Sequence, residues 1–429
     1  MRGEVLRKRL VGSAGRLLSQ LGPPIAVDFG VGSLKLLQVD LGESPSLIAA
    51  ACLETPEDLW KDHSKRLAFQ AEALPRLIKG CGFRGRRAVC GIPAALSLCK
   101  HMQVQRAEGV PLRVLAEGAI AGQLGCSPAQ LVMRCFEVAD LAKGGGGART
   151  EVICMAASRE LVNRLMQALQ DARLQPVGMH SEFVAGLKSF AHISRRLEDE
   201  QAVSLYLDLG AGSTKVMIAH GQKLVFAKRI DLGGQFLDEA VAKQLKVTMA
   251  EARRLRREMD AQIVGEPEAA APAVLRVPID AGTDGEAAES LPAPESVPAM
   301  TMVEERRRAE STVYSGDLSG EPQRGFTPPR ANLAEPLEMI TDELRLCLRY
   351  HESIFPDRPV QRAVFVGGEA VGRGLCQHIA RRVRLPAQTA DPLAGVARSG
   401  KESVPGLDLR RQQPGWAMAL GLCMCPTDL

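Results

Sequence analysis

One short pattern occurs twice in this chain and constrains its fold more than any other feature. An apolar strand ends in an aspartate, a glycine turn follows, and a second strand returns, first at Asp28–Lys35 and again at Asp208–Lys215. Two strands joined in this way form a β-hairpin, and glycines let the backbone amides of the turn approach a phosphate closely. Two copies within 429 residues predict two related lobes of an α/β fold, with the hairpins facing each other.

The hairpin turns carry the chemical groups that bind the phosphates of a nucleotide. Their glycines permit close contact, their hydroxyls donate hydrogen bonds, and a lysine adds positive charge. The chain has no G-x-x-x-x-G-K-[ST] string, so these turns are not Walker A loops. The residues predicted to contact the phosphates are Gly30, Gly32, Ser33, Lys35, Gly210, Ala211, Gly212, Ser213 and Thr214.

Each hairpin also has an aspartate at the end of its first strand. Mg²⁺ prefers oxygen ligands and often keeps several waters in its shell. Asp28 and Asp208 are therefore predicted to hold Mg²⁺, through water, beside the phosphates. The alternative is that each side chain only caps its own turn.

Two Gly-Gly pairs precede predicted helices. Asp231–Gly234 leads into a helix expected over Gln235–Leu245, and Val366–Glu369 precedes a helix expected over Gly374–Val383. A helix dipole favours a nucleotide phosphate that approaches the helix N-terminus, although either pair can instead form a simple tight turn. The predicted nucleotide contacts in these segments are Gly233, Gly234, Gly367, Gly368 and Glu369.

The composition changes sharply within the second half of the chain. Residues 260–334 are rich in Pro, Ala, Glu and Gly, have few large apolar side chains and show no sustained period. Such a segment cannot bury enough apolar surface to offset the entropy of ordering. It is predicted to be a disordered insertion between helices expected over Met249–Met259 and Pro336–His351.

Charge and cysteine usage exclude several classes of protein. The net charge of +4 is spread along the chain, which gives no case for nucleic-acid binding. The eleven cysteines include no C-x-x-C pair and lie mostly in apolar runs. They are predicted to be reduced thiols in a cytosolic protein rather than disulfides or zinc ligands. No run reaches the roughly 18–20 apolar residues of a membrane span.

Residues 1–24 form a basic leader in which apolar side chains recur near the helical period. One interpretation is an amphipathic helix that lies on an anionic membrane surface. The other, which we prefer, is a short helix packed on the body of the protein or a frayed end.

The order of two phosphate hairpins followed by a strand, a Gly-Gly pair and a helix resembles the superfamily of actin, sugar kinases and heat-shock chaperone ATPases. Within it, the chain most resembles the PilM family of type IV pilus assembly, and next the FtsA family of cell division. The likeness runs from about residue 25 to residue 422, apart from the insertion. The strings that carry it are Gly91–Pro93, Leu161–Val177, Phe226–Gly234, Asp342–Tyr350 and Val366–Gly368.

This resemblance implies an actin-like (ribonuclease H-like), two-lobed ATPase fold with an inserted subdomain of the FtsA/PilM type. The implied parts are the leader (1–24), the first lobe with hairpin 1 (25–84), the inserted subdomain (85–175), the first-lobe connector (176–200), the second lobe with hairpin 2 (201–259), the insertion (260–334), the second lobe with the adenosine motif (335–410) and a closing first-lobe helix (411–429).

The resemblance also implies that ATP and Mg²⁺ bind between the lobes. Glu182 stands where the superfamily places a residue near the attacking water, so Glu182 and Asp208 are the predicted catalytic residues. Glu182 can instead simply cap a helix, and His180 stands where the family commonly has Asp. Hydrolysis is therefore expected to be slow at most.

The implied partner is the cytoplasmic tail of PilN, a membrane protein, taken up in a cleft between the first lobe and the inserted subdomain. Such docking would hold a cytoplasmic protein at the inner membrane as a scaffold, beside other pilus or secretion platform proteins. Self-association is a further expectation. Two alternatives stay open, an FtsA-like filament protein of cell division and a sugar or acid kinase. The C-terminal amphipathic helix typical of FtsA is missing from the last residues.

Overall fold

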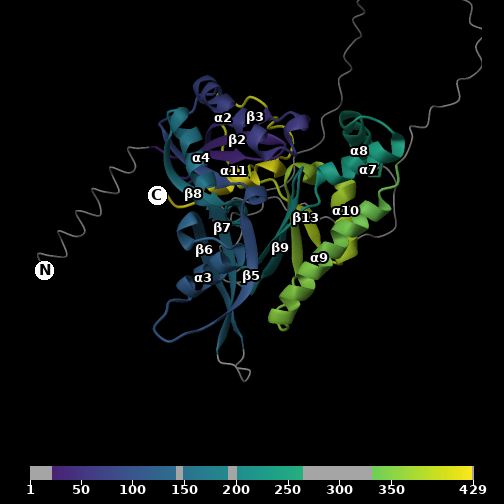
Figure 1. Ribbon diagram of the computed structural model, residues 1–429. Helices are drawn as coiled ribbons and strands as arrows, with labels where there is room; N and C mark the ends of the chain where they lie inside the picture. The colour runs from purple at the N-terminus through teal and green to yellow at the C-terminus, as the bar shows by residue number, and fades with distance from the viewer. Residues whose placement is uncertain (1–21, 142–147, 192–200, 264–330, 428–429) are drawn as a thin grey trace, which may run out of the picture. The chain divides into compact units, whose positions relative to one another are not determined.

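The computed structural model describes residues 22–141, 148–191, 201–263 and 331–427 (Figure 1). The chain divides into two units, Met1–Pro278 with Ala331–Leu429, and Ile279–Arg330. All described residues belong to the first unit. The predicted leader, up to residue 21, and most of the predicted insertion lie outside the described residues.

The first lobe is built on a five-stranded sheet in the order β3-β2-β1-β4-β8. Its central strand β1 pairs antiparallel with β2 and parallel with β4. All of β1 is buried, because helices cover both faces of the sheet. The strands are β1 (Ile25–Phe29), β2 (Ser33–Asp40), β3 (Ser46–Glu54), β4 (Arg87–Ile92) and β8 (Gln175–Ser181).

Three helices enclose this first sheet. Helices α2 and α4 share one apolar core with alternate residues of β1. Helix α11, from the far end of the chain, packs against β1, β2 and β4 on the opposite face (Figure 1). Alternate residues of a strand point to opposite faces, so β1 contributes to both cores. The helices are α2 (His63–Gly80), α4 (Arg159–Asp171) and α11 (Ala417–Cys423).

The second lobe repeats the arrangement in a sheet of order β11-β10-β9-β12-β13. Its central strand β9 pairs antiparallel with β10 and parallel with β12, as β1 does with β2 and β4. The predicted repeat is therefore confirmed. The strands are β9 (Val203–Leu209), β10 (Thr214–His220), β11 (Lys223–Ile230), β12 (Arg362–Val366) and β13 (Ala387–Thr389).

Four helices accompany the second sheet, and none of the described helices is long and apolar enough to cross a membrane. Helix α9 packs against β10 and β11, and α7 packs against α8. The helices are α7 (Gly234–Leu245), α8 (Met249–Ile263), α9 (Ala334–Ile354) and α10 (Arg373–Val383). Short 3₁₀ helices cover Glu57–Leu59, Ala94–Leu96, Pro128–Gln130, Gly368–Val371 and Pro414–Trp416.

A three-stranded sheet of order β5-β7-β6 interrupts the first lobe. Helix α3 covers one face through a small apolar core, and the other face contacts β11 of the second lobe. The elements are β5 (Leu98–Gln105), α3 (Leu112–Leu124), β6 (Leu131–Leu141) and β7 (Arg149–Ser158).

The predicted range of the inserted subdomain, 85–175, does not coincide with this three-stranded sheet. Strand β4 lies within the range but pairs with β1 in the first-lobe sheet. Helix α4 also lies within it, yet its apolar face, including Leu161, Leu165 and Leu169, packs into the first-lobe core. The inserted unit therefore runs from Leu98 to Ser158, because its own sheet begins and ends there.

Candidate functional site: two facing hairpins and a neighbouring pocket

The two predicted hairpins form as expected, and each brings a lysine beside an aspartate. Asp28 is paired with Lys35 across β1 and β2, and Asp208 with Lys215 across β9 and β10. Side chains of directly paired residues in an antiparallel ladder lie on the same face, so each lysine is a neighbour of its own aspartate.

In the second hairpin, the lysine forms two short buried ion pairs. Lys215 Nζ lies 2.7 Å from Asp208 Oδ2 and donates a hydrogen bond of 2.8 Å to Glu182 Oε2. The three side chains are only 6–12% exposed. Burial alone would lower the pKa of Lys215, but the charges of Asp208 and Glu182 outweigh it and hold that pKa above its ordinary range. The ammonium is therefore charged and bridges two carboxylates.

Glu182 reaches this bridge because it begins helix α5 (Glu182–Lys188), which follows strand β8 directly. The Ser181 hydroxyl caps that helix by accepting from the amide of Phe183. The capping role considered for Glu182 thus belongs to its neighbour. Glu182 instead neutralises Lys215 from the opposite lobe.

The first hairpin differs electrostatically from the second. Within the described part of the chain, Asp28 forms no ion pair like that of Asp208. Burial raises the pKa of Asp28 to about 6, with Lys35 opposing the rise and the charges of Glu182 and Asp208 adding to it. The two predicted metal ligands therefore differ: Asp208 is paired with a lysine, whereas Asp28 is desolvated by burial.

The turns of the two hairpins touch each other. A Cβ placed on Gly32 would lie 3.4 Å from the Cβ of Ala211, and one placed on Gly212 would lie 3.1 Å from Val31 Cγ2. The same added Cβ on Gly32 would also lie 3.4 Å from Trp60 Cζ2. A single methyl group on either glycine would therefore already meet the opposite turn, so the gap between the turns is too narrow for a phosphate.

Backbone groups of the second hairpin are also in use. The first amides of helix α7 donate to it: Gly234 N to Gly210 O at 3.0 Å, and Gln235 N to Ala211 O at 2.8 Å. The Thr214 hydroxyl donates to Leu232 O at 2.8 Å. The amides of Gly234 and Gln235 and the hydroxyl of Thr214 are therefore spent on holding the turn against the helix. Gly233 permits this approach, because a Cβ there would lie 2.5 Å from Ser213 N.

The third glycine motif, Val366–Glu369, also lies beside the second hairpin. Gly367 has a φ of 95°, which favours glycine, and a Cβ on it would overlap Asp208 Oδ1 and the backbone of Leu209. Glu369 packs against Gly234, and its carboxylate accepts a hydrogen bond of 2.7 Å from Arg256 Nη2. The structure thus gathers the predicted glycines, while Glu369 is held by an arginine of α8.

A second set of contacts, not predicted from the sequence, joins the two lobes above the hairpins. The Arg253 guanidinium lies 4.1 Å from the centroid of the Trp60 ring and pairs with Glu57 of the first lobe. Arg253 also pairs with Asp238 of α7 at 3.0 Å. We call Glu57, Trp60, Arg253 and Asp238 the interlobe latch. An exposed ion pair, Lys61 with Glu239 at 2.8 Å, lies next to the latch, because Lys61 follows Trp60 and Glu239 follows Asp238 in the sequence.

Mg-ATP, which the fold resemblance implies, does not fit this arrangement as it stands. The turns are in contact, the amides of α7 are occupied, and Asp208 is neutralised by Lys215. Among the described residues, no group of three or more His, Cys, Asp or Glu side chains is placed to hold a metal ion. The predicted roles of Asp28, Asp208 and Glu182 therefore remain predictions for an opened cleft.

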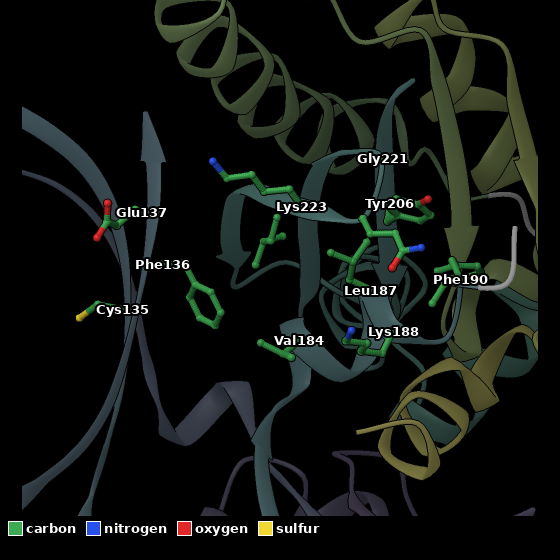
Figure 2. Close-up of a pocket in the computed structure, with 13 residues that line it drawn as sticks. Cys135, Phe136, Glu137, Val184, Leu187, Lys188, Phe190, Tyr206, Gly221 and Lys223 are labelled. Atoms are coloured by element: carbon green, nitrogen blue, oxygen red, sulfur yellow. The ribbon is translucent and has the colours of Figure 1, made fainter. Parts of the chain in front are cut away.

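A separate pocket of about 430 Å³ lies where the inserted sheet, helix α5 and the second-lobe sheet meet. Figure 2 shows Phe136 pointing from β6 toward Val184 and Leu187 of α5. The remaining lining residues are Cys135, Glu137, Lys188, Phe190, Ala191, Tyr206, Gly221, Gln222, Lys223 and Leu224. The wall is mainly apolar, with two lysines among its polar groups.

Sequence reasoning missed Lys215, Trp60, Arg253 and Arg256. Lys215 carried a signal, since it holds the position in hairpin 2 that Lys35 holds in hairpin 1. Helix α8 was recognisably rich in arginine, but nothing in the sequence pairs its arginines with residues of the first lobe. Most of the pocket was likewise unpredicted, because its walls come from distant segments.

Comparison with known proteins identifies a matching family and solved structures of similar fold. The family described as type IV pilus assembly protein PilM matches residues 26–264. A solved PilM-PilN type IV pilus biogenesis complex is 20% identical, with a TM-score of 0.64, and the match covers 94% of this chain and 98% of the solved one. No protein with curated annotation matches the sequence.

Two other solved structures match at 11% identity. The ethanolamine utilization protein EutJ from Carboxydothermus hydrogenoformans has a TM-score of 0.45, with 94% of this chain and 89% of that chain covered. MreB5 of Spiroplasma citri, bound to ADP, has a TM-score of 0.42, with 93% and 94% covered.

Proposed function

The chain belongs to the PilM family of type IV pilus assembly proteins and has its two-lobed, mixed α/β actin-like fold, and on this basis we propose that it is a docking scaffold. The partner that docks on it would be the short cytoplasmic tail of a PilN-like inner-membrane protein. The observation that carries the proposal is the pocket between β6, α5 and the second-lobe sheet.

The pocket has the chemistry of a peptide-anchor site. Phe136, Val184 and Leu187 converge on it and present apolar surface to a cavity large enough for one or two side chains (Figure 2). Buried aromatic and aliphatic anchors dominate the binding energy of such contacts. The solved relative is a complex of PilM with PilN, which supports a PilN-like tail as the occupant.

The charges around the pocket favour a tail with an acidic group beside its apolar anchors. Lys188 and Lys223 are both lining residues. Lys223 Nζ donates to Val138 O at 3.1 Å, which fixes its side chain over β6. Glu137 instead pairs with Arg106 at 3.4 Å, so its charge is partly offset. The net positive rim would steer an acidic segment toward the pocket.

The test measures binding of a synthetic peptide, the cytoplasmic tail of the PilN-like protein from the same genome, by titration calorimetry. Phe136→Ala removes the aromatic anchor, and we expect affinity about 10–30-fold weaker, as for loss of an interface hot spot. Lys188→Glu should also weaken binding, and the loss of affinity should be greater at low salt than at high salt.

Val114→Ala serves as the matched control, because Val114 is 49% exposed on the outer face of α3 in the same inserted unit. It should bind the peptide like the wild type. Wild-type affinity in both Phe136→Ala and Lys188→Glu would show that the tail docks elsewhere.

Docking of this kind would place the protein at the cytoplasmic side of the inner membrane. Contacts with other pilus or secretion platform proteins, and self-association, remain predictions. Of the rival functions, a sugar or acid kinase would need a free acidic base, and Glu182 is paired with Lys215. The FtsA-like alternative has no observation of its own in its favour.

We propose ATP as a ligand only of an opened form. The hairpin turns must separate before a phosphate can enter, since Gly32 lies against Ala211 and Gly212 against Val31. Opening would also break the Arg253 contact with Trp60. Nucleotide binding by this scaffold is therefore coupled to lobe movement, which gives it a means of changing affinity for the tail.

A further inference from the structure

We propose that Lys215 is a built-in counter-ion that takes the place of a divalent cation between Asp208 and Glu182, so that the two hairpins close without Mg²⁺. This inference does not depend on the docking pocket. It concerns the disagreement between the fold, which implies a metal beside the hairpins, and the side chains present there.

The geometry of Asp208 already engages one oxygen and holds the other close to the protein backbone. Its Oδ2 lies 2.7 Å from Lys215 Nζ. Its Oδ1 faces Gly367 so closely that even a methyl group on that glycine would overlap it. A Mg²⁺ ion needs oxygen ligands at about 2.0–2.1 Å in near-octahedral geometry. A cation that binds Oδ2 would therefore have to displace the ammonium.

The charge balance explains why an internal cation is needed. Asp208 and Glu182 come from different lobes, and both are less than a tenth exposed. Two buried carboxylates facing one another would repel strongly, and the hairpins could not close on them. Lys215 contacts both at hydrogen-bond distance, so a single protein ammonium links the lobes where a metal would otherwise do so.

The arrangement is specific to the second hairpin, which provides a control within the same chain. Lys35 occupies the corresponding position in the first hairpin, paired in register with Asp28. Among the residues that the structure describes, no ion pair joins Lys35 to a carboxylate. The two lysines are thus matched in sequence position and differ in role.

One consequence concerns hydrolysis. Glu182 is the residue predicted to orient an attacking water, and its Oε2 accepts from Lys215. A carboxylate held in this way cannot act as a free base or turn toward water without breaking the bridge. The closed form therefore has its candidate metal ligand and its candidate water-orienting group joined to one lysine.

The experiment compares thermal unfolding of the full chain in a chelator and in millimolar MgCl₂, without nucleotide, for the wild type, Lys215→Ala and Lys35→Ala. The wild type and Lys35→Ala should unfold at the same temperature in both buffers, within about 1 °C. Lys215→Ala should lose about 5 °C or more in chelator, because two buried carboxylates lose their counter-ion, and should regain at least half of the loss with Mg²⁺.

Two results would overturn the proposal. The first is stabilisation of the wild type by Mg²⁺, or Mn²⁺ binding to the wild type detected by electron paramagnetic resonance, if Asp208→Asn abolishes the effect. The second is a Lys215→Ala protein that is destabilised yet indifferent to Mg²⁺, which would leave Lys215 as an ordinary salt-bridge partner. If Lys215→Ala does not fold in chelator, preparation with Mg²⁺ throughout must recover folded protein, and failure to do so also overturns the proposal.

Discussion

At the scale of single residues, burial sets the properties of the titratable groups more than local sequence does. Asp28 and Asp208 occupy the same position in two equivalent hairpins, yet one has a raised pKa and the other has a lysine 2.7 Å away. The difference arises from Glu182, a residue of another segment, which draws Lys215 inward. Sequence reasoning gave the two aspartates one role because it could not see this third residue.

Asp28 is predicted to destabilise the folded protein at neutral pH. Its pKa is about 6 in the folded state and near 3.8 when unfolded, so the folded state holds the extra proton between these values. Stability attributable to Asp28 is therefore present at low pH and lost as pH rises through 6. Asp28→Asn should raise the free energy of unfolding by about 2 kcal/mol at pH 7.5 and by little at pH 4.

Denaturant unfolding of Asp28→Asn and wild type from pH 4 to 8 measures this difference. Lys35 opposes the shift, so Lys35→Met should increase the penalty and serves as the opposite control. An Asn variant whose advantage is the same at every pH would contradict the assignment.

A buried histidine pair is predicted to make the second lobe sensitive to acid. His220 Nε2 and His351 Nε2 are 2.9 Å apart, and Phe355 packs against the rings. Burial lowers the pKa of each histidine to about 4, with the charge of Arg358 adding to the effect. Because the unfolded state takes up protons near pH 6.5, stability is full above that pH and falls as pH drops toward 4.

The measurement is the free energy of unfolding between pH 7 and pH 4.5. The double variant His220→Leu with His351→Leu should show a flatter profile over this window than the wild type. An equal slope in both proteins would place the acid sensitivity elsewhere.

At the scale of elements, local sequence patterns predicted individual helices and strands well, but they did not predict which distant strands pair. The helices expected over Gln235–Leu245 and Gly374–Val383 form within one residue of their predicted bounds, as α7 and α10, because apolar periodicity and preceding glycines are local signals. The predicted range of the inserted subdomain was too wide at both ends. The pairing of β4 with β1 joins segments about sixty residues apart, and no pattern within β4 reveals its partner.

The inserted sheet carries a pair of cysteines that is predicted to form a disulfide on oxidation. Cys135 and Cys154 are directly opposite on β6 and β7, and their Sγ atoms are 3.3 Å apart. Directly paired residues on antiparallel strands have Cα atoms within the range of a disulfide. A hydrogen bond from Cys154 lowers the pKa of Cys135, which favours its thiolate as the nucleophile.

Treatment with glutathione disulfide should oxidise both thiols, releasing two equivalents of glutathione thiol and lowering the thiol count of the denatured protein by two. Peptide mapping should recover Cys135 linked to Cys154. Cys135→Ser should remove this reaction without changing the rate of oxidation at the remaining cysteines. Earlier pairing of other cysteines, such as Cys423 with Cys425, would contradict the prediction.

At the scale of the whole described unit, the two lobes are joined at the hairpins by the Lys215 bridge, the hairpin turns and the interlobe latch, in addition to the contact between the inserted sheet and β11. The resemblance to actin-like ATPases predicted the hairpins, since glycine turns are visible in the sequence. It did not predict what holds them closed. Those contacts come from side chains whose partners lie in the other lobe, and such pairing has no periodic signal.

The interlobe latch is predicted to control access to the space between the lobes. Arg253 stacks on Trp60, pairs with Glu57 and Asp238, and is 13% exposed, so its contacts are worth more than those of a surface ion pair. Trp60→Ala should remove the stacking contact and uncover Gly32, against which the Trp60 ring packs. The result should be a larger population of open lobes in a protein that remains folded.

Amide hydrogen exchange of the two hairpin segments, 28–35 and 208–215, reports that population directly. We expect exchange in Trp60→Ala to be about 10-fold faster there, which corresponds to about 1.4 kcal/mol of lost closure, and unchanged in α3 of the inserted unit. Arg254→Ala is the matched control, because Arg254 lies next to Arg253 but, among the described residues, forms its ion pairs with Glu251 and Glu258 of its own helix. Since closure without ligand depends on the latch and on Lys215 together, faster exchange in Trp60→Ala with an intact bridge would show that the latch makes its own contribution. Unchanged exchange would leave the Lys215 bridge and the turns as sufficient to hold the lobes closed.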